Sequence, residues 1–232
     1  MSTAAPPPAA PPPPSKRTRV LRVPARGHYD AATVHAILDA APICHVGYVT
    51  DDGQPIVIPT IHGRIDDTLY LHGAAGNAML RGIDDQPVSV TATIVDGLVL
   101  ARSVFHHSMN YRSVVVLGRG LTVEEPDERM AALEAITERI SPGRWDHCRL
   151  PNEKELRATR VTRIPLAEAS AKIRTGPPSD DADDLDLDVW AGVVPWTTSA
   201  GAPEPAPDLL PDVALPDHVA AMTPPHGRNS PR

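Results

Sequence analysis

Apolar and polar residues alternate with a period of two along much of the central part of the chain. Such alternation is typical of strands that bury one face, because successive side chains point to opposite sides. Alternation is clearest in residues 155–166, and six further segments are also predicted strands: residues 43–50, 55–64, 67–73, 87–97, 98–105 and 111–125. Between the first two, Gly53 in "DDGQ" is available for a positive φ, which predicts a hairpin. Pro59 interrupts the second segment and indicates an edge strand, a bulge or a strand break.

Three segments instead follow the period of a helix. In "HYDAATVHAILDAAP" Asp30 is a candidate N-cap, and apolar residues follow on one helical face: Val34, Ile37, Leu38 and Ala41. Residues 126–140 begin with a proline that suits a first helical turn, and residues 74–83 form a small-residue loop that opens into a short helix. About six short strands, few helices and no regular β–α–β alternation predict a mainly β fold, an antiparallel barrel.

The two ends of the chain have a different composition. Residues 1–19 contain "APPPAAPPPP", which favours an extended polyproline conformation, and residues 201–232 are again rich in proline. We expect both to be disordered tails. Residues 20–200 then form one domain, which is long enough to bury a core.

Charge and composition argue against several classes of protein. The net charge is −7 without a basic stripe, so nucleic-acid binding is not expected. No apolar run reaches the length of a membrane span, about 18 residues, and no apolar segment of a secretory signal follows the basic residues near the N-terminus. Cys44 and Cys148 are far apart and lack a CxxC partner. We expect two buried thiols in a reduced, cytoplasmic protein, with a disulfide as the alternative.

The first candidate for chemistry is "LYLHGAAGNAML", residues 69–80. A strand ends at His72, small residues let the backbone approach a ligand, and a helix starts near Asn77. The N–H groups at such a start suit a phosphate. The alternative is a tight β–α turn that uses glycine and alanine for space.

The second candidate is "SVFHHSMNYRSVVVLG", residues 103–118. Arg112 would share a strand face with buried valines, where a guanidinium is costly unless it meets an anion. Ser108 and Asn110 could supply directional hydrogen bonds to the edge of a heterocycle. The alternative is a polar hairpin loop with a structural Arg–Asp pair.

The third candidate is "AKIRTGPPSDDADDLDLDVWAGVVPW", residues 171–196. Lys172 and Arg174 precede a Gly-Pro turn, and the six aspartates between residues 180 and 188 indicate an exposed acidic loop. Trp190 and Trp196 are large apolar groups that must cover either this core or a neighbouring subunit.

The histidines do not form a recognisable metal motif. His106 and His107 are adjacent, so in an extended segment they point to opposite faces. His45, His62 and His72 fall on three different predicted strands, and no HExxH or Cys/His cluster occurs. We expect no metal site.

Five segments, in this order, closely resemble the flavin-nucleotide-binding proteins of the pyridoxamine 5′-phosphate oxidase superfamily, a branch that includes the nitroimidazole-resistance proteins. They are "APICHVGYV", "QPIVIPTIHGRIDDTLYLHGAAGNAML", "DGLVLARSVFHHSMNYRSVVVLGRG", "SAKIRTGPP" and "VWAGVVPW". The resemblance covers roughly residues 28–198. It implies a six-stranded antiparallel split β-barrel and a homodimer that holds flavin mononucleotide (FMN) in a cleft between its two subunits.

The resemblance also implies the residues of the cofactor site. These are Pro59 and Thr60 beside the flavin ring, His72, Gly73, Ala74 and Asn77 near the phosphate and ribityl chain, Ser108, Asn110, Arg112, Lys172 and Arg174 along the cleft, and Trp190 as its cover. In nitroimidazole-resistance relatives the histidine that matches His72 is functionally important. His72 is therefore the predicted catalytic residue.

One departure bears on the substrate. Pyridoxamine-phosphate oxidases proper use a Ser-x-Lys segment, whereas "GAAGNAML" has neither residue, which argues against vitamin B6 oxidation. The resemblance predicts an FMN-dependent oxidoreductase of a small molecule such as a nitro compound or a quinone-like molecule. The alternative is a non-catalytic flavin- or haem-binding carrier or sensor on the same barrel, with His72 or His106 as a haem ligand.

Overall fold

The computed structural model of the chain describes residues 11–222, so the outermost parts of the two expected tails, residues 1–10 and 223–232, lie outside the described residues. The elements follow the chain in the order η1 Pro24–Arg26, β1 Gly27–His28, α1 Ala31–Ala40, β2 Cys44–Val49, β3 Pro55–Thr60, β4 Gly63–Ile65, β5 Thr68–Ala74, α2 Ala78–Gly82, β6 Pro87–Leu100, η2 Val104–His106, β7 Ser108–Arg119, β8 Leu121–Thr122, α3 Pro126–Ile140, η3 Trp145–His147, α4 Glu153–Ala158, β9 Thr159–Pro165, β10 Ala169–Arg174, η4 Ala182–Asp184, β11 Gly192–Pro195 and α5 Asp217–Ala220.

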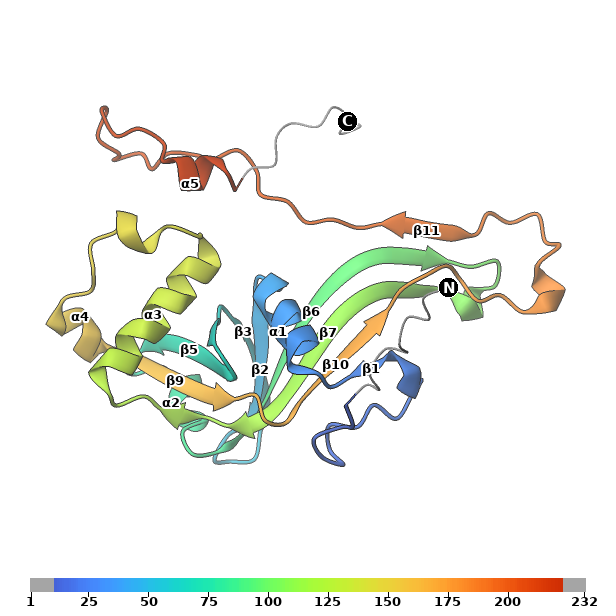
Figure 1. The fold of residues 1–232 in the computed structure, drawn as a ribbon, viewed down its shortest axis with the longest axis horizontal. Coiled ribbons are helices and arrows are strands. Elements are labelled where there is room, and N and C mark those ends of the chain that lie inside the picture. Colours follow the sequence, from blue (N-terminus) through green and yellow to red (C-terminus); the bar gives the residue numbers. More distant parts are fainter. Residues whose placement is uncertain (1–10, 223–232) are drawn as a thin grey trace, which may run out of the picture.

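The strands form two antiparallel sheets. The larger has the order β1-β10-β7-β6-β2-β3, with β11 paired to the distal half of β6, and the smaller has the order β4-β5-β9-β8. The long strands β6 and β7 curve across the molecule, while α3 and α4 lie at the end where the small sheet is found (Figure 1). This arrangement confirms the predicted mainly β, antiparallel split barrel.

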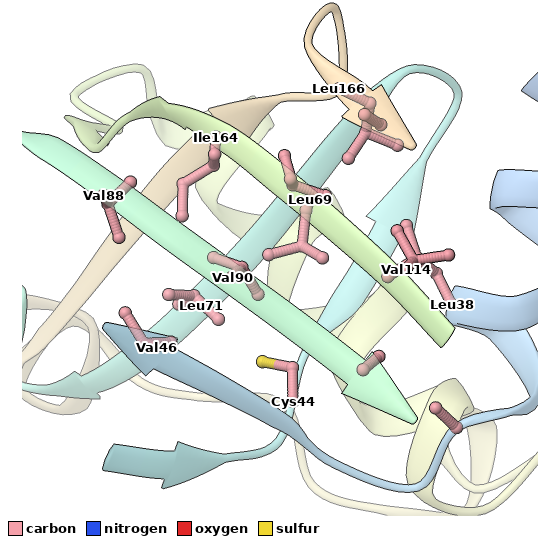
Figure 2. Packing of buried hydrophobic residues seen from close by; sticks show 14 of the residues in the cluster. Leu38, Cys44, Val46, Leu69, Leu71, Val88, Val90, Val114, Ile164 and Leu166 are labelled. Atoms are coloured by element: carbon pink, nitrogen blue, oxygen red, sulfur yellow. The ribbon is translucent and has the colours of Figure 1, made fainter. Parts of the chain in front are cut away.

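The two sheets close on one apolar core. Leu69 and Leu71 of β5, Ile164 of β9 and Val90 and Val114 of the large sheet are fully buried. Their side chains lie in the same space between the sheets (Figure 2). Burial of such side chains contributes about 1.5–3 kcal/mol each, so this shared interior is the main stabilising feature of the barrel.

Helix α1 forms as its sequence predicts, and it packs against the barrel. The Asp30 carboxylate accepts a hydrogen bond from the Thr33 N–H over 2.8 Å and caps the helix. Val34, Ile37 and Leu38 on its apolar face are buried in the core. A second, smaller cluster forms where α3 covers the outer face of the small sheet, and it contains Tyr70, Val123, Ala132, Ile136 and Val161.

The predicted hairpin of residues 43–64 is present. Gly53 has a φ of 86°, and β3 is the edge strand of its sheet, which explains why Pro59 is tolerated there. The two strands predicted on either side of Asp96 are wrong, because β6 runs through this point as one strand with a bulge between Val95 and Gly97. The Asp-Gly pair, a turn signal, instead bends a strand whose partner β7 continues to pair on both sides.

The last part of the domain also differs from the prediction. Residues 155–158 belong to helix α4, which begins with a capping box between Asn152 and Glu155, and only residues after them form strand β9. Strands β10 and β11 follow, so β9 is not the final strand. The expectation of two buried thiols is half wrong: both cysteines are free, Cys44 is buried and Cys148 is exposed.

Part of the expected N-terminal tail contacts the domain. Thr18 is buried, and the Arg17 guanidinium pairs with Glu168 in the turn before β10. Residues 15–18 therefore lie against the barrel. Across residues 11–222 no helix combines the length and the apolar character needed to cross a membrane.

Candidate functional site

Strands β7 and β10 bring several of the predicted polar residues to one end of the large sheet. Their antiparallel register places Lys172 opposite Ser113 and Arg174 opposite Tyr111. Ser108 begins β7 directly after the η2 turn. Residues that lie 59 or more positions apart in the sequence therefore share one surface.

This surface contains a basic cleft of about 490 Å³. Its walls come from β7, β10, the η2 turn, Ser179 and the N-terminal segment before β1. The lining residues include four cations and two histidines and no carboxylate: Arg22, Arg26, His106, His107, Lys172 and Arg174. Ser108, one of the predicted cofactor-binding residues, lines the same cleft.

Arg174 is the most unusual residue of the basic cleft, because it is a buried cation without a carboxylate partner. It is only 5% exposed, and its guanidinium donates to Asn110 Oδ1, to the Gly176 carbonyl over 3.4 Å and to the Pro177 carbonyl over 3.3 Å. Burial and then the nearby charge of Arg26 lower the pKa of Arg174. A desolvated charge with only neutral acceptors is a site that favours an anion.

Asn110 accepts a hydrogen bond from Arg174 and so holds its guanidinium in place. Its side chain is 8% exposed, and its amide nitrogen donates to the Gly176 carbonyl over 3.1 Å while its oxygen accepts from Arg174. Gly176 has a φ of 95°, a conformation that glycine adopts without steric cost. The loop after β10 can therefore turn back and present its carbonyls to the guanidinium.

Arg112 lies in a different cleft. This second cleft of about 530 Å³ is lined by the end of α1, the middle of β6 and the start of the C-terminal segment, including Trp196. Arg112 donates to Asp96 from Nε over 3.0 Å and from Nη2 over 2.7 Å, and the hydrogen bond to Asp96 raises the pKa of Arg112. The structural Arg–Asp pair, which the sequence left open, is therefore present, and it already supplies the anion that Arg112 requires.

The residues from His72 to Asn77 lie on the small sheet and outside both clefts. Asn77 caps its own helix, since its Oδ1 accepts from the Leu80 N–H over 3.1 Å. Two further N–H groups are also occupied: Ala75 donates to Ala158 O over 2.7 Å and Asn77 to Ala74 O over 2.8 Å. Helix α2 has only five residues, so a tight β–α turn describes this segment well.

His72 itself retains an unsatisfied polar atom. Its Nδ1 is buried and has no hydrogen-bond partner within the described chain. Burial lowers the pKa of His72, so its imidazole is neutral at pH 7. Gly73 follows it, and a Cβ there would lie 3.1 Å from Leu80, which shows how closely α2 packs on this strand.

The remaining predicted residues are separate from these groups. Pro59 is exposed on edge strand β3, with Thr60 beside it. Trp190 is 66% exposed, and a Cβ on Gly192 would meet its ring at 3.0 Å. Within one chain the structure therefore brings together Ser108, Asn110, Lys172 and Arg174, but not Pro59, Thr60, His72 or Trp190.

Sequence reasoning missed Arg22 and Arg26. Both residues belong to "KRTRVLRVPAR", a basic stretch that follows the prolines. The local sequence pattern alone gives this stretch no role. The pairing of β1 with β10, which brings these residues to the cleft, joins positions about 145 apart and has no local signature.

Polar contacts of Asp180 and Asp181 hold the acidic loop of residues 180–188 beside the basic cleft. Asp180, with a side chain only 2% exposed, accepts from Arg102 Nη1 over 2.8 Å and from the Arg102 N–H over 2.9 Å. Asp181 lies 3.1 Å from His106. In residues 11–222 no group of three or more histidine, cysteine or acidic side chains could hold a metal ion.

Comparisons with known proteins agree with this fold. The family model described as pyridoxamine 5′-phosphate oxidase matches residues 30–173. The structure of the flavocytochrome Anf3 from Azotobacter vinelandii is 39% identical, with a TM-score of 0.86, over 91% of this chain and 98% of that one. The FAD and heme binding protein from Mycobacterium smegmatis is 36% identical, with a TM-score of 0.81, over 85% of this chain and 97% of that one.

A more distant structure shares the fold alone. A protein from Bacteroides thetaiotaomicron VPI-5482 that is named for 5-nitroimidazole antibiotic resistance is 24% identical, with a TM-score of 0.52, over 62% of this chain and 84% of that one. A search of the curated proteins found no significant match.

Proposed function

Because this chain belongs to the pyridoxamine 5′-phosphate oxidase family, we propose that it is a flavin-dependent redox protein whose basic cleft binds the phosphate end of a flavin nucleotide. The observation that carries this proposal is Arg174, a buried guanidinium without a carboxylate in a cleft lined by three further cations. A phosphate supplies the missing negative charge and accepts charge-assisted hydrogen bonds.

The residues present fit such a group. Lys172 and Arg174 would bind phosphate oxygens, Ser108 would donate from its hydroxyl, and Asn110 would hold Arg174 in place. A bound flavin supplies the electron-transfer chemistry that ordinary side chains lack. The part of this chain is to bind the nucleotide, to orient it and to exclude water from it.

The choice between FMN and FAD belongs to this proposal. The sequence resemblance predicts FMN, whereas one relative is named as an FAD and heme binding protein. The four cations of the basic cleft exceed what one phosphate needs for charge balance. The binding of both nucleotides to the protein therefore has to be measured.

The test is the flavin spectrum of the purified full-length protein. We expect it to bind FMN or FAD with the absorption bands of an oxidised flavin, which a reductant bleaches and a nitro compound or quinone restores. Arg174→Ala should weaken nucleotide binding at least about tenfold, because it removes a charge-assisted contact. The control is Arg157→Ala, an exposed arginine on α4 whose partner is Glu153. Wild-type protein that binds neither nucleotide would refute the proposal.

A haem is a second candidate, and His72 favours it. Haem iron is commonly held by an imidazole nitrogen, and His72 is neutral with an unpartnered ring nitrogen. His106, the other histidine considered, is engaged with Asp181. Two of the similar structures are named for a flavocytochrome and for FAD and heme binding. A Soret band shifted from that of free hemin, which His72→Ala removes and His106→Ala retains, would support this site; a spectrum unchanged from free hemin would refute it.

We also propose that two copies of this chain form a homodimer. The outer face of the large sheet carries two cross-strand rows that nothing in residues 11–222 covers with a helix: Pro59, His45, Thr91 and Val115, and next to it Val57, Gly47, Ser89 and Leu117. Val57 is 63% exposed. A flat sheet face of small and apolar residues suits a second copy of the chain, which would bring Pro59 and Thr60 closer to a partner's site.

A further inference from the structure

The segment of residues 17–28 forms a strap along the edge of the large sheet. It begins at the Arg17–Glu168 ion pair and ends at β1, where Gly27 pairs with Lys172 of β10. Between these points the Val20 N–H donates to the Tyr29 hydroxyl over 2.9 Å. The N-terminal strap is therefore attached to the barrel at both ends, and its first part also bonds to Tyr29, directly after β1.

Two arginines of the N-terminal strap line the basic cleft. Arg22 and Arg26 form no side-chain hydrogen bond or ion pair with any residue between 11 and 222, although both lie beside the cationic groups of Lys172 and Arg174. Four positive charges around one cleft repel one another, and no carboxylate lines it. An anion among them would relieve this repulsion.

The backbone of the strap is also strained at the cleft. Val23 has φ 53° and ψ 67°, a left-handed conformation that β-branched residues rarely adopt. It is followed by the single turn η1, in which the Arg26 N–H donates to the Val23 carbonyl over 3.0 Å. A strained conformation persists where surrounding contacts impose it, and such residues cluster at ligand sites. Here the strained residue lies between Arg22 and Arg26 and lines the same cleft.

We propose that Arg22 and Arg26 form the second half of a diphosphate site, in which Lys172 and Arg174 hold one phosphate and the N-terminal strap holds the other. The inference rests on the proposed flavin function and identifies its ligand as FAD. The strap precedes residue 30, where the family match begins, so the family model assigns no role to either arginine.

The test compares three flavins that differ in phosphate number. FAD has two phosphates, FMN has one and riboflavin has none. We expect affinity to increase in the order riboflavin, FMN, FAD, and Arg22→Ala or Arg26→Ala to lower the affinity for FAD about tenfold each. Riboflavin binding should not change in either variant, because it has no group for the strap to hold. Arg19→Ala is the matched control, since Arg19 is an exposed strap cation outside the cleft.

Two outcomes would overturn the diphosphate site. One is FAD binding to Arg22→Ala and Arg26→Ala with the wild-type affinity. The other is an equal loss of FAD and riboflavin binding, which would indicate a structural role. If the wild-type chain binds no flavin, the proposed function fails separately. The strap site is then decided with inorganic pyrophosphate, which should bind the wild-type protein about tenfold more tightly than either variant, and equal binding would refute it.

A second measurement does not depend on the variants. Trypsin cleaves after arginine, so digestion of the wild-type chain after Arg22 and Arg26 reports whether the strap is accessible. FAD or pyrophosphate should slow these cuts, and riboflavin should not. Equal cleavage rates with FAD and with riboflavin would contradict phosphate binding by the strap.

Discussion

Two arginines on neighbouring strands show how one partner residue decides the role of a side chain. Arg112 of β7 lies opposite Ile173, and Arg174 follows one position later on β10. Arg112 is neutralised by Asp96, whereas Arg174 meets the neutral amide of Asn110. An ion pair leaves little affinity for a further anion, while an uncompensated guanidinium retains it. The difference between a carboxylate and an amide therefore distinguishes the structural arginine from the proposed ligand-binding one.

The substitution Asn110→Asp tests this at the scale of one atom. The new carboxylate would pair with Arg174 and would no longer donate to the Gly176 carbonyl, so the affinity for FAD should fall about tenfold or more. Riboflavin affinity and the far-ultraviolet circular dichroism spectrum should stay as in the wild type, because the fold keeps its packing. Titration of flavin fluorescence measures both affinities. Unchanged FAD binding would show that Arg174 does not need to be free of a carboxylate.

Among the secondary-structure elements, the crossing from β7 to β8 is one of the points where the chain passes from one sheet to the other. Gly120 lies at this point, where its N–H donates to Gln86 O over 3.3 Å and its carbonyl accepts from the Asp85 N–H over 2.7 Å. A Cβ at this position would lie 2.5 Å from the Ile83 carbonyl oxygen. Only glycine lets the strand pass the end of α2 this closely.

We expect Gly120→Ala to destabilise the protein by about 2 kcal/mol, because backbone on one side or the other must shift. Gly76→Ala is the matched control, since nothing lies within 4 Å of a Cβ at that position. It should change the free energy of unfolding by less than about 0.5 kcal/mol. Urea denaturation followed by circular dichroism gives both values. Equal stability of the two variants would mean that the sheet junction adjusts without cost.

At the scale of the whole molecule, the outer face of the large sheet is the feature that bears on the oligomeric state. The barrel buries its inner face and covers the small sheet with α3, but within residues 11–222 no helix covers the rows that contain Val57 and Val115. An exposed sheet face of this kind is unusual in a protein that stays monomeric. The arrangement of the whole chain therefore leads to the proposed homodimer, in which each subunit covers the other.

Light scattering after gel filtration should give twice the chain mass of 24.8 kDa for the wild-type protein. Val57→Glu should shift it to the monomer, because a buried carboxylate without a partner would oppose the interface. Leu150→Glu, at an exposed apolar position in the loop before α4, should remain dimeric. A monomeric wild type at micromolar concentration would refute the dimer, and a dimeric Val57→Glu would place the interface elsewhere.

Local patterns were sufficient for much of the fold. The cap at Asp30 and the glycine turn at Gly53 were predicted from the residues and confirmed, and of the three alternatives for Pro59 the structure has the edge strand. The prediction failed at Asp96–Gly97, where a turn signal became a bulge, because pairing with β7 and β11 outweighs the local preference. It also failed at Cys148, whose burial depends on how the chain is covered and not on its neighbours in the sequence.

The amino-acid pattern alone established the fold class, the main helices and strands and the resemblance to a flavin-binding family, because periodicity and turn chemistry act over a few residues. It predicted that Arg112 and Arg174 line the same cleft. In the structure Arg112 pairs with Asp96, whereas Arg174 donates to Asn110. The basic cleft likewise exists because strand pairing brings Arg26 next to Arg174, although 148 positions separate them. Charge balance between residues so far apart depends on distances in the folded chain, which no local pattern encodes.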